Sequence, residues 1–104
     1  MKGRFEMTKS REIRTKILKI MDLALKISPP DVEKVKGTPD VFVKYSPHCC
    51  VLEVEVYNCG WKYDCDFNDR SFISTSKEDA NKELDEAIEY LRNLREEINN
   101  VSKN

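Results

Sequence analysis

Three runs of alternating apolar and polar residues limit most strongly what this 104-residue chain can fold into. They cover residues 40–45, 50–57 and 61–67, and short turn-like segments with proline or glycine separate them. A period of two places successive side chains on opposite faces of a β-strand. The runs therefore predict an antiparallel three-stranded meander, and residues 71–74 form a candidate fourth strand or edge.

The second run indicates how the two faces of this sheet should differ. Leu52, Val54 and Val56 share one phase, whereas Glu53 and Glu55 share the other. The apolar phase is expected to face the core, together with residues of the flanking strands: Val41, Val43, Tyr45, Trp61, Tyr63 and Phe67. The opposite face is expected to carry the charged residues Lys44, Glu53, Glu55, Lys62, Asp64 and Asp66.

Segments with helical periodicity flank the sheet on both sides. Over residues 9–27, apolar residues recur at spacings of three and four, and the prolines at 29 and 30 end the segment because proline cannot continue a helix. The expected buried residues are Ile13, Ile17, Ile20, Met21 and Ala24, and Leu18, Leu25 and Ile27 widen the same face.

A second helix is predicted over residues 76–100. Its start offers two capping boxes, Thr75 with Glu78 or Ser76 with Asp79. Its apolar residues keep a 4-3 heptad spacing: Ala80, Leu84, Ala87, Leu91, Leu94, Ile98 and Val101.

Together these elements predict a single α+β domain over residues 1–104. The expected order is α-β-β-β-α, with the sheet at 40–74 packed on the N- and C-terminal helices. Residues 1–8 are expected to form a flexible extension before the first helix. Charged residues make up 36% of the chain, but the apolar residues are periodic, so we expect a folded domain rather than a disordered chain.

Charge is distributed unevenly along the chain, although the net charge is only −1. Residues 1–30 hold eight Lys/Arg and three Asp/Glu, a balance of +5, whereas residues 31–76 and 77–104 each give −3. This distribution makes a strongly basic nucleic-acid-binding protein an unfavoured class. No apolar run approaches the length of a membrane span, and residues 1–10 lack the apolar core of a signal peptide. We therefore expect a cytoplasmic protein with reduced cysteines.

The soft metal ligands His48, Cys49, Cys50, Cys59 and Cys65 lie close together in the sequence. Structural zinc sites usually take two thiolates from a C-x-x-C turn, whereas the adjacent Cys49 and Cys50 would face opposite sides of a strand. We expect no bound metal; if one did bind, the ligands would be His48, Cys49, Cys50 and Cys59. A Cys–His nucleophile pair lacks an orienting partner, and phosphate-binding and zinc-protease motifs are missing from the sequence. We therefore expect no enzymatic activity and no cofactor.

Two surfaces are candidates for binding another protein. Glu53, Glu55, Asp64 and Asp66 are expected to form an acidic stripe, which is either a solvated face or a docking surface for a basic partner. The heptad seam at residues 80–101 either packs within the chain or pairs with a second copy to form a homodimer. The second reading arises because the seam is longer than a small sheet can cover.

The segment 41–61 reads V-F-V-K-Y-S-P-H-C-C-V-L-E-V-E-V-Y-N-C-G-W. It resembles small uncharacterised proteins from phages and mobile elements of Gram-positive bacteria, in which an apolar strand, a Ser-x-His turn, an alternating strand and a Gly-Trp corner follow one another. The matching residues are Ser46, His48, Val54, Val56, Tyr57, Gly60 and Trp61; Pro47 and the doubled cysteine depart from the pattern. The resemblance implies an accessory protein in the cytoplasm of a bacterial host that acts by binding.

We therefore expect a small non-enzymatic protein that occupies the surface of a protein partner, such as a host regulator or defence component. The residues expected to make the contact are Glu53, Glu55, Asp64, Asp66, His48 and Trp61. One alternative is a metal-binding or thiol-active module built on His48 and the cysteines. Another is a small-ligand-binding dimer in which Trp61 and Tyr63 line a pocket.

Overall fold

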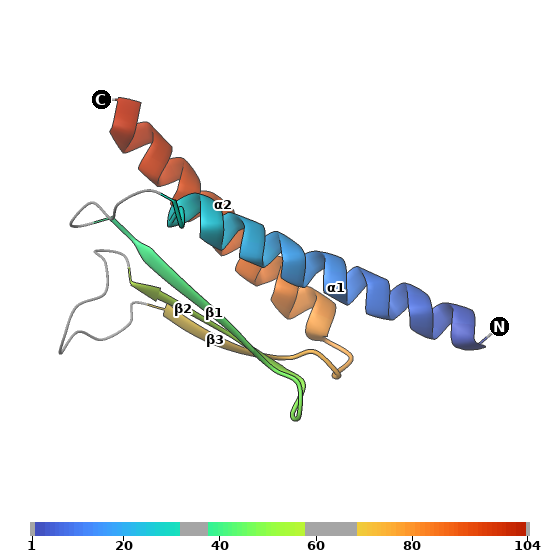
Figure 1. Cartoon of the computed structure of the whole chain (residues 1–104). Coiled ribbons are helices and arrows are strands. Elements are labelled where there is room, and N and C mark those ends of the chain that lie inside the picture. The colour runs from blue at the N-terminus through green and yellow to red at the C-terminus, as the bar shows by residue number, and fades with distance from the viewer. Residues whose placement is uncertain (1, 32–37, 58–68, 104) are drawn as a thin grey trace.

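The computed structural model describes residues 2–31, 38–57 and 69–103, with side-chain environments for 9–31, 38–57 and 70–99. Five elements lie in these segments: α1 (Lys2–Ile27), β1 (Asp40–Ser46), β2 (Val51–Tyr57), β3 (Asp69–Ser74) and α2 (Ala80–Lys103). The predicted α-β-β-β-α order and the α+β class are confirmed (Figure 1). The strand predicted at 61–67 lies outside the described residues, and the candidate edge at 71–74 belongs to β3.

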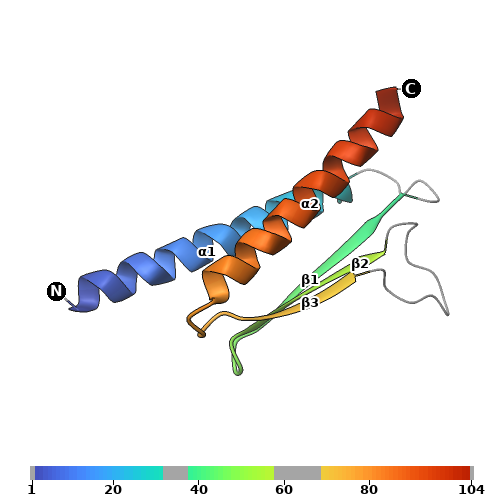
Figure 2. The ribbon, with the colours of Figure 1, turned by 180° about the vertical axis from the view of Figure 1, so that it is seen from behind.

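The strands form one antiparallel sheet in the order β1-β2-β3. Val54 of β2 is paired with Val43 of β1 and with Ser71 of β3, so these three residues share one face. Figures 1 and 2 show both helices on the same side of the sheet. The opposite side carries no helix among the described residues.

The two helices lie side by side and run in the same direction, opposite to β1 and β3 (Figures 1 and 2). α1 lies closer to β1, and α2 lies closer to β3. The N-terminal turns of α1 and the C-terminal turns of α2 project at opposite ends of the molecule. The sheet is therefore covered by the C-terminal part of α1 and the N-terminal part of α2.

The core lies where both helices meet the covered face of the sheet. Its most completely buried side chains come from all three parts of the fold: Ile20, Leu23, Leu52, Val56, Ile73, Leu84 and Leu91. The heptad seam of α2 is part of this core, because Ala80, Leu84, Leu91 and Leu94 are buried and Ala87 and Ile98 are half-buried. The seam thus packs against α1 and the sheet of its own chain.

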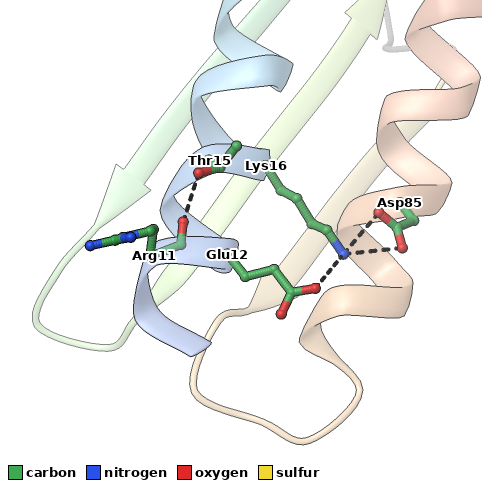
Figure 3. Close-up of polar contacts among 5 residues, drawn as sticks. All are labelled: Arg11, Glu12, Thr15, Lys16 and Asp85. Carbon is green, nitrogen blue, oxygen red and sulfur yellow. Dashed lines mark hydrogen bonds and ion pairs between the residues drawn. The ribbon is translucent and has the colours of Figure 1, made fainter. Parts of the chain in front are cut away.

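One ion pair joins the two helices at the edge of this core (Figure 3). The Nζ atom of Lys16 lies 3.0 Å from Oδ1 and 3.2 Å from Oδ2 of Asp85, and 3.7 Å from the Glu12 carboxylate. The Thr15 hydroxyl donates a hydrogen bond to the Arg11 carbonyl oxygen, and the Arg11 side chain points away from α2. Lys16 is therefore held between the helices, whereas Arg11 lies on the side of α1 that faces away from α2.

The predicted apolar face of α1 is only partly correct. Ile20 and Ala24 are buried as expected, but Leu18, Met21 and Leu25 are exposed. At 3.6 residues per turn, Leu18 lies roughly 160° around the helix from Ile20, and Leu25 roughly 140°. They cannot widen a face centred on Ile20, and no other described element covers them.

Both helices begin at positions that differ from the predicted ones. α1 starts at Lys2 rather than at residue 9. Residues 2–8 include Lys, Arg, Glu and Met, which extend helices readily. α2 starts at Ala80 rather than at residue 76. Thr75 does not cap α2, because its amide and hydroxyl donate hydrogen bonds to the Cys50 carbonyl oxygen at 2.8 and 3.1 Å. Asp79 stands at the N-cap position, where aspartate is favoured.

The β1–β2 turn, residues 47–50, explains why β2 begins one residue later than predicted. Cys50 has a φ of 52°, in the left-handed region that a side chain makes costly, so it cannot be the first residue of a strand. The turn is closed by a hydrogen bond from the Cys49 amide to the Ser46 carbonyl oxygen at 3.4 Å. Through the bonds from Thr75 to Cys50, this turn is tied to the segment between β3 and α2.

We predict that Leu84→Ala destabilises the protein by about 2–5 kcal/mol, because Leu84 is 0% exposed and its truncation leaves a cavity. The matched control is Leu18→Ala, which removes the same atoms from a side chain that is 64% exposed. That control should change the free energy of unfolding by less than about 0.5 kcal/mol. Urea unfolding of both variants measures this, and equal losses would contradict the placement of the two leucines.

Candidate functional site

The outer sheet face, defined as Phe42, Lys44, Glu53, Glu55, Arg70 and Phe72, is the face that the helices leave uncovered. Strand register brings these side chains together in two rows across the sheet. In one row, Glu55 of β2 lies between Phe42 of β1 and Arg70 of β3; in the next, Glu53 lies between Lys44 and Phe72. Directly paired residues are close enough for their side chains to interact.

Arg70 binds both glutamates of this face. Its Nη2 atom lies 2.8 Å from Glu53 Oε1 and 2.8 Å from Glu55 Oε1, and its Nε donates a hydrogen bond to Glu53 Oε1 at 3.1 Å. The Tyr57 hydroxyl donates a further hydrogen bond to Glu55 Oε2 at 3.0 Å. One cation on β3 thus holds two carboxylates of β2 in fixed positions.

The pKa of Arg70 reflects this arrangement. Desolvation of the guanidinium lowers its pKa, but the hydrogen bond to Glu53 and the negative charges of Glu55 and Glu53 together raise the pKa above its ordinary value. Arg70 therefore stays charged at any pH at which the protein is folded. Arg70 and Lys44, which lies opposite Glu53, together balance the charges of the two glutamates within the outer sheet face.

Two aromatic side chains dominate the exposed surface of this face. Phe42 is 48% exposed and Phe72 is 60% exposed. The Phe42 ring meets the buried Tyr57 ring edge-on, with centroids 5.5 Å apart and an interplanar angle of 84°. The Arg70 guanidinium carbon lies 4.8 Å from the Phe72 ring centroid, within the range of a cation–π contact. Both phenylalanines are therefore held by neighbours while much of each ring faces solvent.

The residues predicted from the sequence are only partly brought together. Glu53 and Glu55 lie on the outer sheet face as expected. Asp64, Asp66 and Trp61 lie outside the described residues. Arg70 and Phe72 are not among the predicted site residues, because residues 71–74 are predicted only as a candidate fourth strand or edge. The alternation of Arg70, Phe72 and Ser74 with Ser71 and Ile73 is the signal that could have found them.

His48 and Cys49 are exposed in the β1–β2 turn, and Cys50 is half-buried beside them. The Cys49 thiol contacts the Ser46 carbonyl oxygen at 3.7 Å, and the Cys50 thiol contacts the Pro47 carbonyl oxygen at 3.8 Å. Cys59 and Cys65 lie outside the described residues. Within the parts of the chain that the structure describes, no group of three or more His, Cys, Asp or Glu side chains could hold a metal ion.

A cleft between β3 and α2 is one of the hollows among the described residues that a small ligand could enter. Its volume is about 370 Å³, and its lining combines buried apolar residues, among them Val54 and Leu91, with Glu83, Glu86 and Tyr90. This volume is near the lower end for sites that take small molecules. Trp61 and Tyr63, the residues predicted to line such a pocket, lie outside the described residues.

We predict that the purified protein holds less than one zinc ion per chain and that Cys49 reacts with Ellman's reagent without unfolding, because its thiol is exposed. Elemental analysis and thiol titration of native and unfolded protein measure both. The control variant is Cys49→Ser, which should lose the fast-reacting thiol. One zinc per chain that disappears in His48→Ala or Cys49→Ser would contradict the prediction and favour a metal-binding module.

Comparisons with protein-family models, with curated proteins and with solved structures found no match at a significant level. None of the helices in the described parts of the chain combines the length and apolarity needed to cross a membrane. A function therefore has to be argued from the surfaces of this chain.

Proposed function

We propose that this chain is a small non-enzymatic binding protein whose outer sheet face docks on a protein partner. The observation that carries the proposal is the pair of exposed phenylalanines, Phe42 and Phe72, on a sheet face that neither described helix covers. Antiparallel sheets that face solvent usually present polar side chains outward. Two large apolar rings at outward positions favour a face that becomes covered in a complex.

The energy available from these two rings is sufficient for a specific contact. A phenylalanine has about 200 Å² of side-chain surface, so roughly 100 Å² of each ring is exposed. At about 25 cal/mol per Å², covering each ring contributes roughly 2.5 kcal/mol. Aromatic residues and arginine supply most of the binding energy in protein interfaces, and this face combines two phenylalanines with Arg70.

The fixed position of the Arg70 side chain should strengthen binding further. Arg70 is fixed by Glu53 and Glu55 and lies against Phe72, so fewer rotamers remain to be lost on binding. Because the opposite charges already neutralise each other, the partner need not be basic. We propose a folded protein with an apolar patch and little net charge at the contact, and binding that depends only weakly on salt.

Several expectations from the sequence remain proposals beside this one. They are a phage or mobile-element origin, a host regulator or defence component as the partner, and a cytoplasmic location. The homodimer through residues 80–101 also remains a proposal, although Ala80, Leu84, Leu91 and Leu94 of the seam are buried within the chain. The lack of enzymatic activity also remains a prediction.

To test the proposal, tagged wild-type protein and the double variant Phe42→Ser/Phe72→Ser are used to purify partners from cells that make the protein. The recovered partner is identified, produced separately and titrated against both proteins by calorimetry at low and high salt. We expect the double variant to bind at least about thirtyfold more weakly, since aromatic anchors each contribute on the order of 2 kcal/mol.

The matched control is Leu18→Ser/Leu25→Ser, which removes two exposed apolar side chains from α1 instead. It should bind the partner of the outer sheet face as wild type does. Equal binding by the phenylalanine variant, loss of binding in the leucine variant alone, or recovery of no partner by wild-type protein would each contradict the proposal.

A further inference from the structure

A second exposed apolar surface lies on α1, away from the outer sheet face. Leu18, Met21 and Leu25, which we name the α1 stripe, are all exposed and follow one another at spacings of three and four residues. This spacing places them on one side of the helix, apart from the side that carries Ile20 and Ala24. Each is a large apolar side chain that no other described element covers.

The stripe continues into a groove at the β1–β2 turn end of the molecule. This hairpin-end groove has a volume of about 600 Å³, and Leu18 belongs both to it and to the α1 stripe. Its other apolar lining comes from Ile13, Ile17 and Tyr45. Tyr45 shares a sheet face with the core residues Val41 and Val43, yet it remains exposed because it lies in this groove.

The charges beside this surface that make no ion pair among the described residues are positive, and Asp22, four residues after Leu18, is already paired with Lys19 and Lys26. Lys9 and Arg14 line the groove, and Arg11 points away from α2 (Figure 3). None of the three makes an ion pair with another described residue, whereas Lys16 is paired with Asp85 and Lys26 with Asp22. An anionic ligand would therefore meet three cations that carry no competing partner in the described parts of the chain.

Two kinds of occupant fit this surface poorly. A second copy of α1 would bring the same cations against Lys9, Arg11 and Arg14, and the apolar seam of a second α2 is buried in its own chain. A small molecule would be poorly enclosed, since the stripe and groove together run from Lys9 to Leu25, about 24 Å along the helix.

We propose that the α1 stripe and the hairpin-end groove bind an acidic amphipathic helix of another protein. Its apolar side chains, spaced three and four apart, would pack between Leu18, Met21 and Leu25, as helices do when they dock in apolar grooves. Its carboxylates would pair with Arg11 and Arg14. This surface belongs to the helix layer, so it can be occupied while the outer sheet face is also occupied.

The test uses a display library of helical peptides of about 18 residues, long enough to follow the 24 Å surface. Leucine is fixed at one face at three- and four-residue spacing, and the flanking positions vary among Glu, Lys, Gln and Ser. The library is selected on wild-type protein and counter-selected on Leu18→Asp/Leu25→Asp. We expect the selected peptides to carry an excess of Glu and to bind more weakly as the salt concentration rises.

The affinity of the most strongly enriched peptide for each protein variant is then measured by fluorescence anisotropy. Leu18→Asp and Arg14→Glu should each weaken binding about tenfold or more, while Phe42→Ser/Phe72→Ser should bind as wild type does. All variants change exposed residues, and thermal unfolding checks that they fold. Selection of neutral or basic peptides, of peptides that bind the counter-selection variant equally, or of none would overturn the inference. The phenylalanine variant separates this result from the outer-face proposal.

Discussion

The joint burial of Leu52 from the sheet, Ile20 from α1 and Leu84 from α2 is the interaction on which the rest of the structure depends. Each of these side chains is completely buried, and full burial of such a side chain contributes about 1.5–3 kcal/mol. A three-stranded sheet needs a covering layer to be stable, and the two parallel-running helices provide it on one face. The same arrangement places both described helices on one face and leaves Phe42 and Phe72 of the other face exposed.

Both proposed binding surfaces follow from this packing. Because most of the α2 seam is covered by α1 and the sheet, most of the large apolar side chains that are exposed among the described residues lie elsewhere, on the outer sheet face and on the side of α1 that points away from α2. The two surfaces differ in charge. On the first, Arg70 forms ion pairs with both Glu53 and Glu55, whereas on the second Arg11 and Arg14 make no ion pair among the described residues. They are therefore suited to different partners.

Much of the fold, but less of the site, could be predicted from the sequence. Alternation in β2 correctly placed Glu53 and Glu55 on the face opposite the core, because a strand leaves only two directions for a side chain. Their pairing with Arg70 depends on strand register, which no local pattern reports. The exposure of Leu18 depends on how much of the surface of α1 is covered by α2 and β1, which a local sequence pattern does not report. The left-handed Cys50 was missed because glycine, not cysteine, usually marks such a position.

Binding through the outer sheet face requires that Phe42 and Phe72 be exposed in the isolated chain. Hydroxyl-radical footprinting of the purified protein tests it directly, with each residue's oxidation rate normalised to that in the unfolded chain. We expect Phe42 and Phe72 to be oxidised nearly as readily, on this normalised scale, as the exposed Leu18, and Leu52 and Leu84 to be protected. Protection of both phenylalanines to the level of Leu52 and Leu84 would contradict the account, because it would mean that another layer covers this face.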